Sequence, residues 1–241
     1  MQTLCIDIGN TRIKYALYEQ DVLQNVVHCT DEELLSMLMH LPLSTRVMIC
    51  TVRQKNEALE NKLAQFDEHC TLSHVTKLPI AFKYSTPDTL GTDRIALACA
   101  ASKQFPNENT LVISLGTCIT YNFVEGNTFI GGAISPGLAM RHKAMHQFTQ
   151  KLPDVAININ APLIANGTTE NLQSGAFNGM LAELHGIIEA YGRQYPRFNV
   201  VLTGGNITQF APRMNCRIFA DENFLFSGLY SIAEFHFGAG A

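Results

Sequence analysis

The stretch LCIDIGNTRIKYALYE, residues 4–19, contains an apolar strand, a glycine turn and a second strand. The run that ends at Ile8 is rich in β-forming residues, Gly9-Asn10 is a turn signal, and polar and apolar residues alternate after Arg12. The stretch LVISLGTCITYNFVEG, residues 111–126, repeats this order of strand, Gly-Thr turn and strand. Each stretch precedes a third expected strand and then helices, so the chain is predicted to consist of two related α/β halves.

We place the boundary between the halves at residue 110, which gives an N-terminal half of 1–110 and a C-terminal half of 111–241. A capping box at 30–33 opens the first expected helix. The other expected elements are buried strands at 46–50 and 199–202 and helices at 56–66, 95–105, 138–148, 169–191 and 222–237.

The composition excludes several classes of protein. With 46% apolar and 16% charged residues, the 241-residue chain can bury a core, and its net charge of −4 offers no basic excess for nucleic acid or anionic membranes. The seven cysteines are scattered and never form CxxC, so neither a disulfide framework nor a zinc site is indicated. With no signal peptide and no apolar stretch of about 20 residues, we expect a soluble, cytoplasmic protein.

The turn Asp7-Ile8-Gly9-Asn10-Thr11 has the chemistry of a phosphate site. Glycine allows a close backbone approach, nearby amides form an anion-binding concavity, and Asp7 can hold Mg²⁺ through water. Lys14 can reach a phosphate as a point charge. An ordinary Gly-Asn hairpin turn remains the alternative.

The segment at 83–94, KYSTPDTLGTDR, places a carboxylate and a guanidinium before an apolar helix. Asp93 can accept a hydroxyl proton, and Arg94 can hold a carboxylate or phosphate bidentately. The alternative is that Thr92 or Asp93 caps a helix that begins at Ile95.

Two facing hairpins and a strand that ends in Thr203-Gly204-Gly205 are together similar to the actin, hexokinase and heat-shock chaperone ATPase superfamily. That resemblance implies a nucleoside triphosphate in a cleft between two ribonuclease-H-like halves. The chain has neither a Walker A loop nor GxGxxG, which disfavours the P-loop and Rossmann folds.

From end to end the chain resembles type III pantothenate kinases. The matching motifs, in order, are DIGNTRIK, YSTPDTLGTDR, LGTCIT, GGAISPGLAMRHKAM, NGTTENLQSG and LTGGN. The resemblance implies ATP-dependent phosphorylation of pantothenate to 4'-phosphopantothenate, the first step of coenzyme A biosynthesis, by a homodimer that uses Mg²⁺ and a monovalent cation, K⁺ or NH₄⁺.

The resemblance also implies roles for individual residues. Asp93 is the expected general base, Asp7 the expected Mg²⁺ ligand through water, and Thr168 is expected to contact pantothenate, in relatives across a dimer interface. The expected ATP-binding residues are Asp7, Ile8, Gly9, Asn10, Thr11, Arg12, Ile13, Lys14 and Thr117. The expected pantothenate-binding residues are Tyr84, Gly91, Thr92, Asp93, Arg94 and Thr168.

This chain departs from the family at the second phosphate motif. Ser114 stands where the family usually has the aspartate that binds the monovalent cation, opposite Asp7 in the internal repeat. Asn122 also stands where an aspartate is common. Both changes are expected to remove negative charge near the phosphates and to weaken the cation site. Two alternatives stay open: another small-molecule kinase of the superfamily, and a non-catalytic transcription accessory factor.

Overall fold

The computed structural model describes residues 1–53 and 56–238. The chain divides into two compact units, which are described separately. The first comprises Met1–Asn107, Val124–Gly131 and Asn223–Ala241, and the second comprises Glu108–Phe123 and Gly132–Glu222. These units are defined by contacts, whereas the expected halves, 1–110 and 111–241, rest on the sequence repeat. The halves therefore stay a prediction.

A five-stranded sheet forms the centre of the first unit. Its strands, in spatial order, are β3 (Val22–Cys29), β2 (Ile13–Glu19), β1 (Gln2–Ile8), β4 (Arg46–Thr51) and β5 (His69–Thr71). β1 pairs antiparallel with β2 and parallel with β4. Because side chains alternate between faces along a strand, Asp7 lies on the face opposite to Ile6 and Ile8.

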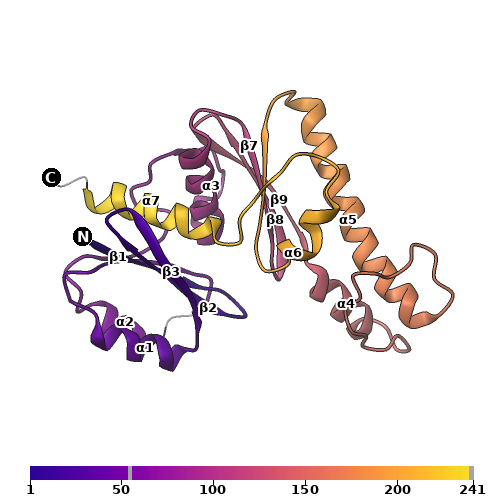
Figure 1. The fold of residues 1–241 in the computed structure, drawn as a ribbon, viewed down its shortest axis with the longest axis horizontal. Helices are drawn as coiled ribbons and strands as arrows, with labels where there is room; N and C mark the ends of the chain where they lie inside the picture. The colour runs from indigo at the N-terminus through magenta and orange to yellow at the C-terminus, as the bar shows by residue number, and fades with distance from the viewer. Residues whose placement is uncertain (54–55, 239–241) are drawn as a thin grey trace. The chain divides into compact units, whose positions relative to one another are not determined.

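Helices cover both faces of this sheet (Figure 1). On one face, Ile6, Ile8 and Ile49 pack in one core with side chains of α1 (Asp31–His40) and α2 (Glu57–Leu63). On the other face, α3 (Thr92–Gln104) contacts β4, and α7 (Phe224–Gly238) contacts β1 and β4. The two helices pack on each other. The first unit is thus a helix–sheet–helix sandwich, with Asp7 on the α3 face.

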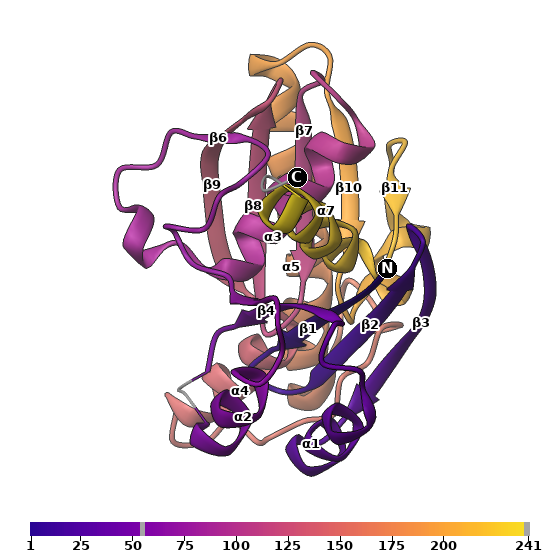
Figure 2. The ribbon, with the colours of Figure 1, turned by 90° about the vertical axis from the view of Figure 1, so that its left-hand side faces the viewer.

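A second sheet repeats the strand order of the first (Figure 2). Its strands, in spatial order, are β11 (Phe219–Ala220), β10 (Asn199–Thr203), β7 (Thr110–Leu115), β8 (Cys118–Glu125), β9 (Thr128–Pro136) and β6 (Ala81–Phe82). The order β9-β8-β7-β10-β11 matches β3-β2-β1-β4-β5, and β7 pairs parallel with β10 as β1 does with β4. The predicted internal repeat is confirmed at this level.

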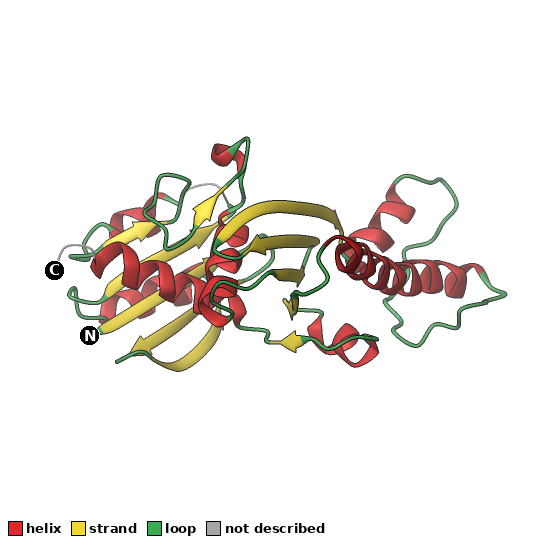
Figure 3. Cartoon of the chain, turned by 90° about the horizontal axis from the view of Figure 1, so that it is seen from above, coloured by secondary structure: helices red, strands yellow, loops and turns green. Residues whose placement is uncertain are grey.

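The second unit also contains helices α4 (Leu138–Gln147), α5 (Thr168–Gln194) and α6 (Ile207–Phe210). Residues 148–167, between α4 and α5, form no helix or strand and are drawn as loop in Figure 3. Phe148, Leu163 and Ile164 in this loop are each at least 81% exposed. Exposed apolar side chains can mark an interaction site where they lie together in one patch.

Some predicted boundaries were wrong. α3 begins at Thr92, not at Ile95, and its N-cap is Gly91 with no side-chain cap hydrogen bond. Neither Thr92 nor Asp93 is therefore the cap, and both belong to the first helical turn. The short elements that the sequence did not indicate are β5, β6, β11, α6 and two 3₁₀ turns at Pro87–Thr89 and Ala211–Arg213.

No helix within 1–53 or 56–238 is long and apolar enough to cross a membrane.

Candidate functional site

The first glycine turn joins β1 to β2 and is open to solvent. Asn10, Thr11 and Arg12 are exposed, and the Gly9 amide donates to the Arg12 carbonyl oxygen at 3.1 Å. The side chains of Ile8 and Ile13 lie in the core. Of the residues expected to bind ATP, these two therefore offer only their backbone.

Asp7 lies just before this turn on the α3 face of the sheet. In the strand register it is opposite Lys14 on β2 and Cys50 on β4. Burial, followed by the nearby Asp93 carboxylate, raises the pKa of Asp7 to about 6, although Lys14 and Arg53 act to lower it. Two neighbouring carboxylates in a poorly solvated place favour a bound cation.

The start of α3 is fixed to the end of β4. The Thr92 hydroxyl donates to the Thr51 carbonyl oxygen at 3.0 Å and lies 3.3 Å from the Cys50 sulfur. Asp93 follows, and burial raises the pKa of its carboxyl, while the Arg94 amide and guanidinium oppose the shift. A raised pKa makes Asp93 a better proton acceptor.

Gly91 leaves room for the Asp93 carboxylate. A Cβ added at Gly91 would lie 2.5 Å from Asp93 Oδ1. The missing side chain at Gly91 thus leaves space for the Asp93 carboxylate, and the role of Gly91 in pantothenate binding stays a prediction.

Two aromatic rings lie near the Arg94 guanidinium. Arg94 is 5% exposed, and its Cζ lies 5.9 Å from the ring centre of Tyr84 and 5.7 Å from that of Phe129. The Tyr84 and Phe129 ring centres are 5.9 Å apart. The structure thus brings together Tyr84 and Arg94, as predicted, and adds Phe129. Phe129 was not among the residues that the sequence indicated for this site.

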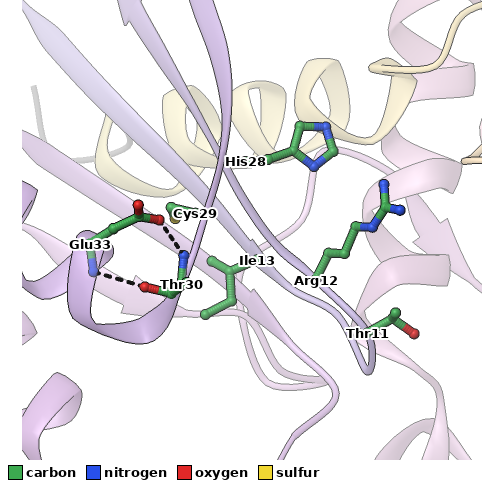
Figure 4. A pocket seen from close by; sticks show the side chains of 7 residues that line it. All are labelled: Thr11, Arg12, Ile13, His28, Cys29, Thr30 and Glu33. Atoms are coloured by element: carbon green, nitrogen blue, oxygen red, sulfur yellow. Dashed lines mark hydrogen bonds between the residues drawn. The ribbon is translucent and has the colours of Figure 1, made fainter.

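A pocket of ≈ 440 Å³ lies beside the first turn (Figure 4). Thr11 and Arg12 line it, and the Arg12 and His28 side chains extend towards the same space. At its other end, Thr30 and Glu33 form the predicted capping box. The pocket gives solvent access to the side chains of the turn. The Glu33 carboxylate at its other end disfavours an anion there.

The second glycine turn, in the second unit, packs against the start of α4. The Gly116 amide donates to the Cys118 carbonyl oxygen at 3.0 Å, and the Gly137 amide donates to the Thr117 carbonyl oxygen at 3.1 Å. A Cβ at Gly137 would lie 2.2 Å from the Gly116 oxygen. Only glycine permits this approach, and it leaves Thr117 exposed.

An ion pair between Arg141 and Glu183 supports the same corner. Arg141 Nε donates to the Pro136 carbonyl oxygen at 2.9 Å, and the Tyr121 hydroxyl donates to Glu183 at 2.8 Å. The Arg141 guanidinium and hydrogen bonds to Glu183 hold the pKa of this carboxyl below its usual value despite burial. Sequence reasoning missed this network because its members lie far apart in the chain.

Ser114 and Asn122, the two neutral residues at positions where aspartate is usual in the family, have different surroundings. Ser114 is half-buried on β7, opposite Thr203 on β10, and the Asn206 amide donates to the Leu115 oxygen at 3.1 Å. Asn122 is 0% exposed, and its side-chain amide donates to the Val112 oxygen at 3.3 Å and to the Thr120 hydroxyl at 3.0 Å. The Asn122 amide is therefore part of the sheet interior, and the expectation that it removes charge near the phosphates stays a prediction.

The residues fit Mg²⁺ only in part. Among the described residues, no group of three His, Cys, Asp or Glu side chains converges on one point. Asp7 and Asp93 supply oxygen donors of the type that Mg²⁺ prefers, so water or phosphate must supply the rest. Ser114 offers a neutral oxygen suited to a weak monovalent site. Thr168 is exposed as the first residue of α5.

Known proteins resemble this chain along most of its length. The sequence profile described as "Type III pantothenate kinase" matches residues 3–190. A type III pantothenate kinase of Flavobacterium psychrophilum is 35% identical over 237 residues, which cover 96% of this chain and 98% of that protein.

Solved structures give the fold alone, because their identities are low. A Campylobacter jejuni protein, described as a Baf family transcriptional activator, aligns with TM-score 0.63 and 20% identity over 96% of this chain and 97% of its own. A ROK family glucokinase from Streptomyces griseus aligns with TM-score 0.54 and 11% identity over 99% and 100%. The predicted actin-like, two-lobed α/β fold is confirmed. On the family match and the near full-length relative, the chain belongs to the type III pantothenate kinase family.

Proposed function

We propose that this enzyme transfers the γ-phosphoryl group of ATP to the primary hydroxyl of pantothenate, giving 4'-phosphopantothenate and ADP in the first step of coenzyme A biosynthesis. Family membership gives the reaction. The observation that carries the site assignment is Asp93, a carboxylate with a raised pKa in the first turn of α3, beside Asp7.

Asp93 is the group best suited to accept the hydroxyl proton. As the pantothenate oxygen bonds to phosphorus, the bond from phosphorus to the ADP oxygen breaks, and the proton moves to Asp93. Thr92 holds the first turn of α3 against Thr51. Motion of Asp93 relative to Asp7 is thereby restricted.

Arg94 is the residue best suited to bind the pantothenate carboxylate. Arginine binds carboxylates bidentately, and the rings of Tyr84 and Phe129 restrict its guanidinium. The Thr92 hydroxyl donates to the Thr51 carbonyl oxygen. We therefore assign Thr92 to positioning more than to direct substrate contact.

The first glycine turn and Lys14 would bind ATP through backbone amides, the Thr11 hydroxyl and one point charge. Thr117 in the second turn stays an ATP-binding residue expected from the family resemblance. Bound Mg²⁺, held in part through Asp7, would neutralise phosphate charge. Placement of these amides before the reaction lowers the barrier, because no reorganisation is needed as charge develops.

The proposal also includes a monovalent cation site, a homodimer and a cytoplasmic location. Ser114 would support only a weak site for K⁺ or NH₄⁺, because a hydroxyl lacks the charge of a carboxylate. A homodimer is supported by the exposed Phe148, Leu163 and Ile164, which precede Thr168 in the chain. A cytoplasmic location stays a prediction from the sequence.

The test is direct detection of phosphopantothenate from ATP and pantothenate, with and without K⁺. Asp93→Asn should lower kcat by at least about 10²-fold, within the range of general base catalysis, while ATP binding is retained. Near-normal turnover of this variant would show that Asp93 is not the general base. A panel of sugars and polyols as acceptors separates this proposal from another kinase of the fold. Absence of any transfer would favour a non-catalytic protein.

A further inference from the structure

Arg53 follows β4 and reaches across to the first glycine turn. The end of β4 runs beside the end of β1, where the Val52 amide donates to the Ile8 carbonyl oxygen at 3.2 Å. The Arg53 amide donates to the Thr51 hydroxyl oxygen at 3.2 Å. From this fixed backbone, Arg53 Nε donates to the Gly9 carbonyl oxygen at 2.6 Å.

The far side of the same guanidinium pairs with a helix. Arg53 Nη1 lies 3.5 Å from Asp31 Oδ2, and Asp31 is the first residue of α1. The capping box at Thr30 and the buried side chains of Leu34 and Leu38 hold α1 in place. Arg53 thus connects the exposed turn to a helix that is packed in the core.

The hydrogen bond to Gly9 sets the direction of the next amide. The Gly9–Asn10 peptide is planar and trans, so its C=O and N–H point in opposite directions. With the oxygen directed at Arg53, the Asn10 N–H points to the other side of the turn. A reversed peptide would turn its oxygen, a partial negative charge, towards any anion bound there.

We propose that Arg53 is a positioning residue for ATP, which holds the Gly9–Asn10 peptide so that the Asn10 amide faces the phosphates. This inference rests on the proposed use of the first turn as a phosphate site, but it does not depend on the acceptor. Asp31 acts with Arg53, because it limits the guanidinium to the orientation that reaches Gly9.

Direct ATP binding to the full-length protein, by calorimetry without pantothenate, tests the inference. Loss of a hydrogen bond from a charged donor is worth about 1.5–3 kcal/mol, so Arg53→Gln should weaken ATP binding by about tenfold or more. In turnover assays the KM for ATP should rise while the KM for pantothenate stays within twofold. Arg53→Lys should recover part of the loss, and Asp31→Asn should give a smaller loss of the same kind.

Arg46→Gln is the matched control. Arg46 lies at the start of β4 and pairs with Glu68 and Glu234, so its loss removes ion pairs from the same sheet. This variant should lower the melting temperature and leave the KM for ATP unchanged. Folded Arg53→Gln and Asp31→Asn proteins that bind ATP like wild type would overturn the role of Arg53. If Arg53→Gln weakens ATP binding but wild type makes no phosphopantothenate, the role of Arg53 stands and the proposed function is wrong.

Discussion

Gly137→Ala is expected to displace the second glycine turn. The added Cβ would lie 2.2 Å from the Gly116 oxygen and 2.6 Å from the Thr117 oxygen, whereas ordinary contact begins at 3.4 Å. Both atoms belong to the backbone, so no side-chain rotation relieves the clash. The Gly116 oxygen must therefore retreat by about 1 Å, and the hydrogen bond from the Gly137 amide to Thr117 is strained with it.

The displacement gives the size of the effect. A misplacement of about 1 Å in a catalytic arrangement can lower the rate by about 10²-fold. Overpacking costs about 1–3 kcal/mol of stability. We therefore expect kcat to fall by about 10²-fold in Gly137→Ala, measured by ADP release under saturating ATP and pantothenate, together with a lower melting temperature.

The control is Gly186→Ala in α5 of the same unit, where an added Cβ meets nothing within 4 Å. Alanine in a helix interior is favoured over glycine by about 1 kcal/mol, so this variant should melt at a higher temperature and keep its kcat. The reasoning is refuted if Gly137→Ala loses stability as expected but keeps kcat within twofold of wild type.

Two further predictions concern the first unit. Because the pKa of Asp7 is raised from 3.8 to about 6, the folded state binds more protons than the unfolded state between these values, and stability falls as pH rises through this range. Asp7→Asn should therefore be more stable than wild type at pH 8, with a difference that shrinks as pH falls from 6 to 4 in thermal melts; a constant difference would contradict this account. Phe129→Leu removes a ring from the Arg94 guanidinium, an interaction worth about 0.5–2 kcal/mol, so the KM for pantothenate should rise by about two- to thirtyfold while that for ATP does not. Phe82→Leu, which truncates a ring packed on Phe129, should leave both values unchanged.

The sequence was sufficient for the fold because each level of evidence agreed. The glycine turns at Gly9 and Gly116, the alternation of strand residues and the capping box at Thr30 are local signals, and the structure has each of them. The repeat of these signals predicted two related α/β halves, and the structure has two sheets that share one strand order.

The exact boundaries of the site's elements, and the contacts that hold its residues in place, could be seen only in the structure. The start of α3 at Thr92 depends on a hydrogen bond to Thr51, 41 residues away. The position of Arg53 against Gly9 and Asp31 depends on the parallel pairing of β1 with β4. Neither contact has a local sequence signal, because both join segments that are distant along the chain.

The two glycine turns are held in place by different interactions. Substitutions in the two turns should therefore have different effects. The first has charged neighbours, Asp7, Lys14 and Arg53, and so its variants should change the pH dependence and the affinity for ATP. The second contains no charged residue between Ser114 and Thr120 and is placed by the close packing of Gly137. Its variants should lower kcat without moving the pH profile. A shift of the pH profile in Gly137→Ala would contradict this account. It would show that the second turn is electrostatically coupled to the first although Ser114 is neutral.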